Sequence, residues 1–184
     1  MTMRGYFGIG VEGVSKEQNV GTIARSAHSF GASFFFTIDP EVDVHKFRSS
    51  DTSDAFDHLP YHQYDSVDTF VLPEKCALVA VELVEDSIEL PSFRHPIRAA
   101  YVLGPEMGNV SPELLEKCDH VIKIPMKFCV NVGVAGALVM YDRVLSMGKF
   151  APRPVRAGGP TESLPPPQTS LRRKVRNPKK YVKS

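Results

Sequence analysis

Residues 34–38, Phe-Phe-Phe-Thr-Ile, form an almost unbroken apolar run that ends at Asp39-Pro40. A run of this length without polar alternation is typical of a strand that is buried on both faces of a parallel sheet. Four further apolar runs predict additional strands at residues 6–11, 76–81, 99–103 and 120–124. We therefore expect an α/β fold with a mostly parallel sheet that is flanked by helices on both faces.

Helices are predicted between these strands and after the last of them. Residues 18–30 should form one that ends at Gly31, with a single apolar face made of Val20, Ile23, Ala24, Ala27 and Phe30. Residues 112–117 should form another, with Ser111 as N-cap and Pro112 at the first position. An apolar helix over 131–147 carries small residues in its first turns, which let another backbone approach closely. A short helix is expected at 66–72, and loops with one short helix over 46–64.

The charges divide the chain into two parts. Residues 1–150 carry 13 Lys and Arg against 20 Asp and Glu, whereas residues 151–184 carry 9 against one, Glu162. We expect one domain over 1–150, followed by a basic, Pro-rich tail over 151–184 that is disordered in isolation. Such a tail would attract a polyanion such as RNA through counterion release, and the alternative is that it only keeps the chain soluble.

Composition argues against several classes of protein. No run approaches the roughly 20 apolar residues that span a bilayer, and the N-terminus lacks the apolar core of a signal peptide. The three cysteines, Cys76, Cys118 and Cys129, share no metal-ligand spacing, and the histidines show no ligand pattern. We expect a cytoplasmic protein without disulfides, membrane segments or a metal site.

Residues 8–13, Gly-Ile-Gly-Val-Glu-Gly, match the dinucleotide-binding pattern, and Asp39 follows the next strand. That pattern requires its glycines in the turn after the strand, where a helix begins. Here Gly8 and Gly10 fall inside the predicted strand. We therefore disfavour a nicotinamide or flavin site, because glycines within a strand more often mark a close backbone approach.

Three segments combine Gly or Pro with a polar side chain suited to chemistry: 19–25 (Asn-Val-Gly-Thr-Ile-Ala-Arg), 103–108 (Leu-Gly-Pro-Glu-Met-Gly) and 124–131 (Ile-Pro-Met-Lys-Phe-Cys-Val-Asn). Taken singly, Asn19 and Asn131 read as helix caps. Arg25 alone reads as a surface arginine, and Glu106 as part of a helix-entry loop. Pro125 should end a strand and leave nearby backbone groups free to bind a ligand.

In their order and spacing these segments resemble the motifs of the SPOUT superfamily, SpoU/TrmH branch, over about residues 4–148. Members of this family are S-adenosyl-L-methionine-dependent RNA 2′-O-ribose methyltransferases, are homodimeric and tie their C-terminal segment into a deep trefoil knot. The resemblance implies methylation of a ribose 2′-hydroxyl in tRNA or rRNA, with the small-residue helix from Asn131 as a dimer surface. It also implies a cofactor site in the knot, formed by Val81, Gly104, Ile124, Met126, Cys129 and Val130.

The resemblance also implies catalytic roles. Arg25 would stabilise the charge that develops on the attacking oxygen, because a guanidinium stays protonated and is a poor general base. Asn19, Glu106 and Asn131 would position Arg25 and the ribose. The third motif is shorter than is usual in the family and has Cys129 in place of a serine. The alternative is therefore a non-catalytic RNA-binding or assembly factor that retains the fold.

Overall fold

The computed structural model describes residues 5–44, 55–150, 153–154 and 157–158. The chain divides into two units, Met1–Gly148 and Lys149–Ser184, and the helices and strands reported below all lie in the first. The predicted basic tail falls almost wholly outside the described residues, so its disorder stays a prediction. Part of the predicted loop region over 46–64 also lies outside them.

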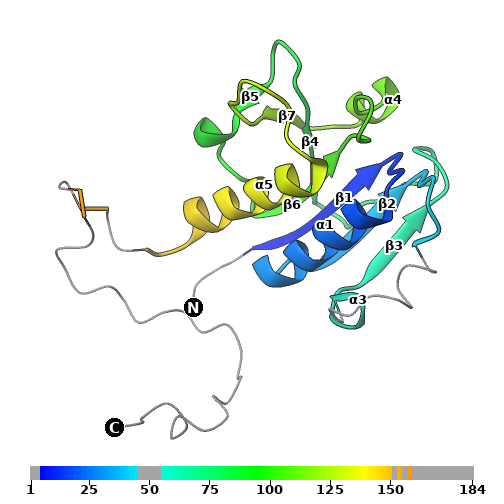
Figure 1. Cartoon of the computed structure of the whole chain (residues 1–184), viewed down its shortest axis with the longest axis horizontal. Coiled ribbons are helices and arrows are strands. Elements are labelled where there is room, and N and C mark those ends of the chain that lie inside the picture. Colours follow the sequence, from blue (N-terminus) through cyan, green and yellow to red (C-terminus); the bar gives the residue numbers. More distant parts are fainter. Residues whose placement is uncertain (1–4, 45–54, 151–152, 155–156, 159–184) are drawn as a thin grey trace, which may run out of the picture. The chain divides into compact units, whose positions relative to one another are not determined.

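The first unit is built on a seven-stranded sheet in which every pair of neighbouring strands is parallel (Figure 1). The strands are β1 (Tyr6–Glu12), β2 (Phe34–Ile38), β3 (Tyr61–Tyr64), β4 (Ala77–Val81), β5 (Ile88–Glu89), β6 (Arg98–Leu103) and β7 (His120–Lys123). Their order across the sheet is β3-β2-β1-β6-β4-β7-β5. The predicted α/β fold with a parallel sheet is confirmed, and so are its five predicted strands.

Two strands insert between strands that precede them in the chain. Strand β6 lies between β1 and β4, and β7 lies between β4 and β5. In register, Val81 pairs with both Leu103 and Ile122. This arrangement sets the carboxyl ends of β4, β6 and β7 side by side, where ligands of parallel α/β sheets commonly bind.

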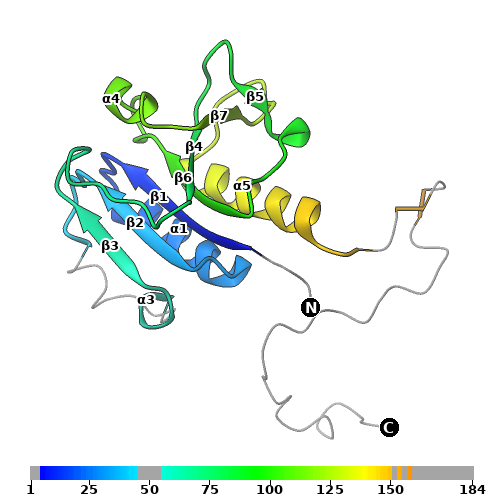
Figure 2. The ribbon, with the colours of Figure 1, turned by 180° about the vertical axis from the view of Figure 1, so that it is seen from behind.

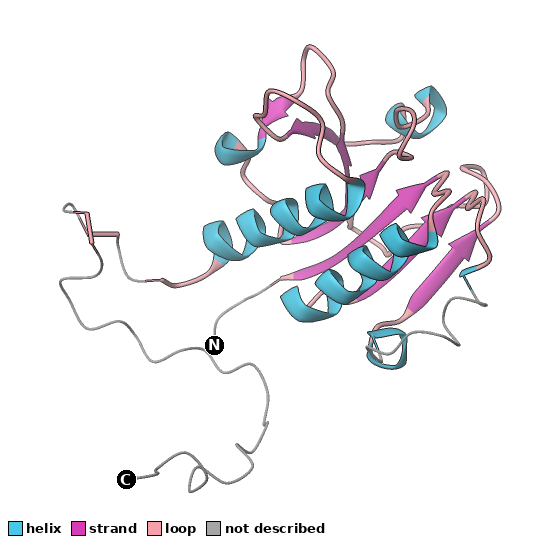
Figure 3. Ribbon diagram, viewed as in Figure 1, coloured by secondary structure: helices cyan, strands magenta, loops and turns pink. Residues whose placement is uncertain are grey.

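Two long helices, α1 (Glu17–Phe30) and α5 (Val132–Met147), cover one face of the sheet (Figures 1 and 3). Asn131 is the N-cap of α5 as predicted, because its side chain accepts a hydrogen bond from the Gly133 amide. The predicted cap at Asn19 is wrong. Helix α1 begins two residues before Asn19, its N-cap is Lys16, and Asn19 is buried in the first turn.

The other face is covered mainly by irregular chain and by short helix α4 (Pro112–Leu115), whose predicted cap Ser111 is confirmed. Figure 2 shows the segment after β3 crossing this face. The helix predicted over 66–72 is wrong, because this segment forms a turn closed by hydrogen bonds between Ser66 and Thr69. Its Phe70 stacks on Phe36 of β2 at a centroid distance of 5.1 Å.

Two further short helices are α3 (Ala55–His58) and η1 (Leu90–Ser92).

Gly8 and Gly10 lie inside β1, as predicted, and the helix that follows starts only at Glu17. A Cβ atom at either glycine would collide with an aromatic ring of β2, that of Phe34 or Phe36. The glycines therefore make room for two buried rings. The dinucleotide-binding context is absent from this strand and turn.

A buried cluster of polar side chains links α5 to β6 through hydrogen bonds. Arg143 of α5, with 1% of its surface exposed, donates hydrogen bonds to the carbonyls of residues 96–97 at 2.7 and 2.9 Å and to the Tyr101 hydroxyl at 3.0 Å. His95 lies between Tyr101 and Asp142, within hydrogen-bond distance of both. Burial lowers the pKa of His95 below its ordinary 6.5, although Asp142 acts to raise it. No pattern in the sequence predicted a role for these residues.

Candidate active site

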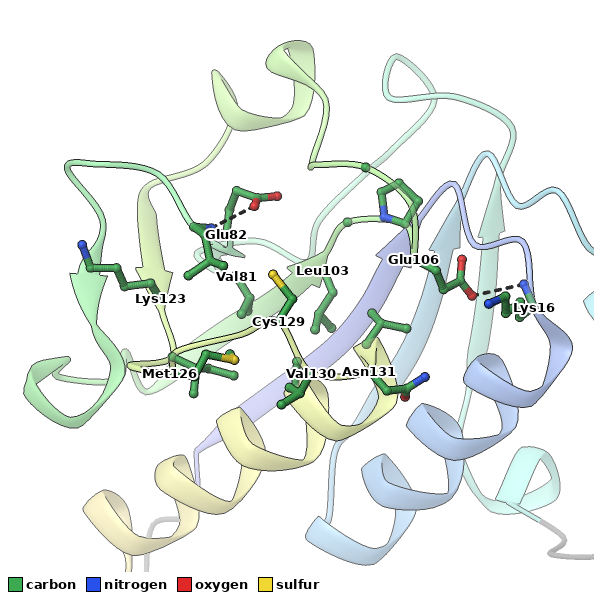
Figure 4. Close-up of a pocket in the computed structure, with 17 residues that line it drawn as sticks. Lys16, Val81, Glu82, Leu103, Glu106, Lys123, Met126, Cys129, Val130 and Asn131 are labelled. Carbon is green, nitrogen blue, oxygen red and sulfur yellow. Dashed lines mark hydrogen bonds between the residues drawn. The ribbon is translucent and has the colours of Figure 1, made fainter.

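A cavity of about 290 Å³ opens at the carboxyl ends of β4, β6 and β7 (Figure 4). Its walls come from the segments that follow these strands and from the start of α5. All six residues predicted to bind a cofactor line it: Val81, Gly104, Ile124, Met126, Cys129 and Val130. Their common location follows from the strand register, because the three strands end at the same edge of the sheet.

The segment 124–130 presents free backbone groups to this cavity. Pro125 is the second residue after the end of β7, and none of the amides or carbonyls of residues 124–130 makes a hydrogen bond to the described part of the chain. Four residues of this segment line the cavity. Free polar groups facing a cavity are available to a ligand, which is what the position of Pro125 predicted.

A chain of hydrogen bonds joins the three sequence motifs beside the cavity. The Asn131 side-chain Nδ2 donates to Asn19 Oδ1 at 2.8 Å, and Asn19 Nδ2 donates to Glu106 Oε1. Asn131 Oδ1 accepts a hydrogen bond from the Gly133 backbone amide at 2.8 Å. Residues far apart in sequence therefore hold one another in fixed orientations.

Glu106 also binds the segment that leads into α1. Its carboxylate accepts hydrogen bonds from the Ser15 amide and hydroxyl at 3.0 and 2.9 Å and from the Lys16 amide at 3.1 Å. Burial acts to raise the pKa of Glu106, but the hydrogen bonds from Ser15 and Asn19 outweigh it and lower the pKa from 4.5 to about 2. The group is therefore a carboxylate at neutral pH, placed at the positive end of the α1 dipole.

Arg25 does not join this network. Its side chain is exposed, it does not line the cavity, and it makes no hydrogen bond or ion pair with the described residues. It lies six residues beyond Asn19 on α1, which corresponds to about 9 Å along the helix axis. The structure thus brings Asn19, Glu106 and Asn131 together, but the predicted contact between Glu106 and Arg25 is not present within the chain.

Residues 7–141 match the model of the SpoU rRNA Methylase family. The chain belongs to that family. A curated relative, the tRNA (guanosine(18)-2′-O)-methyltransferase of Aquifex aeolicus (strain VF5), is 25% identical over 137 residues, which cover 71% of this chain. The chain spans 65% of the length of that relative. The resemblance drawn from the three motifs is therefore confirmed.

Solved structures of SpoU proteins share the fold. The A. aeolicus TrmH/SpoU tRNA modifying enzyme has a TM-score of 0.66 at 20% identity, and the match covers 79% of each chain. The SpoU methyltransferase AviRb from Streptomyces viridochromogenes, solved in complex with AdoMet, has a TM-score of 0.66 at 22% identity, over 76% of this chain and 57% of AviRb. At these identities the likeness establishes the fold.

Sequence reasoning missed three charged residues of this SpoU-family pocket: Lys16, Glu82 and Lys123. Glu82 directly follows β4 and accepts a hydrogen bond from the Val110 amide at 2.8 Å, which fixes the loop after β6. Lys123 is the last residue of β7 and Lys16 the residue before α1. Their places at element ends were the available signal, since such positions meet at one edge of a parallel sheet.

Among the described residues, no group of three or more His, Cys, Asp or Glu side chains is arranged to hold a metal ion. None of their helices is both long enough and apolar enough to cross a membrane.

Proposed function

We propose that this chain transfers a methyl group from S-adenosyl-L-methionine to a ribose 2′-hydroxyl of tRNA or rRNA. The observation that carries the proposal is the cavity at the ends of β4, β6 and β7, with the free backbone of 124–130 on one side and the Asn131–Asn19–Glu106 network beside it. Membership of the SpoU family and the activity for which the A. aeolicus relative is named support the same reaction.

The residues of the cavity fit this cofactor. Apolar side chains such as Val81, Leu103 and Ile124 suit the faces of an adenine ring, and the free amides and carbonyls of 124–130 suit its polar edge. Lys123 and Glu82 offer charges for the amino-acid end and the ribose. When bound, the cofactor supplies an electrophilic methyl group. The protein's part is to align the ribose with it and to stabilise the oxygen that attacks.

Arg25 is the group we assign to that stabilisation, or to holding a phosphate of the RNA. A guanidinium stays protonated, so it acts through its charge and its hydrogen-bond donors and not as a base. Arg25 points to solvent and lies outside the lining of its own cavity. We therefore assign it to a site completed by a second copy of the chain, with Asn19, Glu106 and Asn131 positioning the ribose.

The surface of α5 supports such a homodimer. Val134, Leu138 and Tyr141 recur at intervals of four and three residues and are 46%, 39% and 51% exposed, which makes an apolar stripe on one helix face. The small residues that sequence reasoning assigned to a dimer surface have another use. Gly133 and Gly136 are buried within the chain, against Thr22 and Ile9.

The trefoil knot belongs to the same proposal. Two observations support it: β6 and β7 insert between strands that precede them in the chain, and the segments after these two strands line the cavity, where the resemblance places the knot. We further propose that the basic tail over 151–184 assists RNA capture, since the remainder of the chain carries net negative charge. Action on tRNA or rRNA is consistent with the cytoplasmic location expected from the sequence.

The test combines ligand binding with product analysis. Purified chain should be stabilised against heat by S-adenosylhomocysteine, because a ligand that binds only the folded state raises stability. Mass spectrometry of nucleosides from tRNA and rRNA, with and without the protein, should reveal a 2′-O-methylated nucleoside. The absence of stabilisation would refute the proposal. Stabilisation with no methylated nucleoside in any RNA would favour the non-catalytic alternative.

Arg25→Ala should abolish methyl transfer and leave the thermal shift with S-adenosylhomocysteine nearly unchanged. Arg94→Ala is the matched control, because Arg94 is also exposed and does not line the cavity. Retained turnover in Arg25→Ala would overturn the role assigned to Arg25.

A further inference from the structure

Phe128 is 85% exposed, more than any other phenylalanine among the described residues. Most others are buried, as in β2 and at Phe7, Phe56 and Phe93. A large aromatic side chain that contacts water over nearly its whole surface stabilises nothing in the folded chain. Its exposure therefore points to a partner that covers it.

The position of Phe128 beside the cavity indicates that its partner binds at the candidate active site. It lies between Met126 and Cys129, both of which line the cavity, within the segment whose backbone makes no hydrogen bonds to the described residues. Met107, 91% exposed, lies between two lining residues of the loop that follows β6. Both loops around the candidate active site thus carry an apolar side chain that is open to solvent.

Charge around the opening favours an anionic partner. Lys127 is exposed next to Phe128, and Lys16 and Lys123 line the cavity. The two lining carboxylates, Glu82 and Glu106, each accept hydrogen bonds from backbone amides, which offset part of their negative charge. A lysine beside an exposed aromatic ring is the combination that binds single-stranded nucleic acid, through a phosphate and a stacked base.

We propose that Phe128 is a stacking platform for an unpaired nucleobase of the substrate RNA, at the target nucleotide. The proposal rests on the proposed function, because a ribose that enters this cavity brings its own base to the rim. Every base has a π-face, so stacking holds the nucleotide without reading its identity. A base within a duplex has no free face. The structure thus assigns the substrate to loops or single strands of RNA.

Binding to RNA without cofactor tests this directly. The full chain is titrated into a labelled RNA hairpin with an unpaired loop, and into a matched RNA duplex. Phe128→Ala should weaken hairpin binding about 5- to 150-fold, the range that loss of one stacked base produces. Phe128→Trp should restore it. The salt dependence of binding should be the same in all variants, because the phosphate contacts are unchanged.

Two controls keep the result interpretable. Val71→Ala removes another exposed apolar side chain, 67% exposed, which does not line the cavity. It should bind the hairpin as the wild type does. Phe128→Ala should also keep its thermal shift with S-adenosylhomocysteine, which shows that it is folded.

Three outcomes would overturn the stacking role. These are unchanged hairpin binding by Phe128→Ala, equal losses on hairpin and duplex, or a change in oligomeric state on sedimentation, which would place Phe128 between copies of the chain. Failure of the proposed function looks different. In that case no methylated nucleoside forms, while the loss of hairpin binding in Phe128→Ala and its rescue by Trp persist.

Discussion

Replacing Glu106 with glutamine tests whether its negative charge fastens the loop after β6 to the start of α1. Glutamine keeps the shape of the side chain, but one oxygen becomes an NH₂ group. The NH₂ should turn toward Ser15, because Oε1 accepts two hydrogen bonds, from Lys16 and Asn19, and the Ser15 hydroxyl can rotate to accept one. The variant then leaves the Ser15 amide without a partner and makes the remaining bonds with a neutral acceptor.

The magnitude follows from the pKa of the carboxylate. A pKa of about 2 in place of 4.5 sets an upper limit of about 3 kcal/mol on the stabilisation at neutral pH. Because the carboxylate is partly exposed, solvent screening reduces this to roughly 1–2 kcal/mol. We expect Glu106→Gln to lower the free energy of unfolding by that amount at pH 7, which is a fall of about 2–8 °C in Tm for a unit of this size.

Urea unfolding followed by far-ultraviolet circular dichroism suits a chain without tryptophan. The folded-state pKa of Glu106 is depressed, so its stabilisation is present above about pH 4.5 and is lost as the pH falls toward 2. The difference between wild type and Glu106→Gln should therefore shrink between pH 5 and pH 3. Glu89→Gln, at an exposed glutamate of β5, should show little difference at either pH. A difference that is absent at pH 7, or equal at pH 7 and pH 3, would refute the reasoning.

Three further predictions concern the core. His95 has a lowered pKa, so the free energy of unfolding should fall as the pH drops below about 6.5, and His95→Gln should flatten this dependence in urea titrations at pH 7 and 5. Arg143→Met should destabilise the fold by about 2–4 kcal/mol, because it leaves the carbonyls of residues 96–97 unpaired; wild-type stability would contradict this. Gly133→Val should cost about 1–3 kcal/mol, because its side chain would strike Thr22, while Val134→Ala on the exposed face should cost little.

Strands buried on both faces could be predicted from sequence, because burial on both sides leaves a continuous apolar run such as Phe34–Ile38. Strand β3 was not predicted, because it lacks such a continuous apolar run. It is an edge strand with sequence Tyr-His-Gln-Tyr, and none of its residues is fully buried. The segment 66–72, predicted as a short helix, does not form one. It begins with a turn and packs the partly buried side chains of Val67, Phe70 and Leu72 against the sheet.

Some features of the candidate active site could likewise be predicted from the sequence and others could not. The location of the six pocket residues followed from the resemblance, since strand ends and loops keep their order along the chain. The partners of Asn19 did not, because they depend on contacts between distant segments. A helix normally takes its cap from a neighbouring residue, but Lys16 offers no side-chain cap. The Ser15 and Lys16 amides are bound by Glu106, about 90 positions later, which no local pattern reports.

The pairing of β1 with β6 also affects synthesis of the chain. Tyr6 pairs with Arg98 and Val11 with Leu103, so one edge of β1 stays open until the ribosome has added β6. The open edge belongs to a strand whose residues are nearly all buried in the finished fold. An exposed apolar edge is a template for wrong pairing with other chains. The nascent chain should therefore be most prone to aggregate, and most dependent on chaperones, in the interval between completion of β2 and arrival of β6.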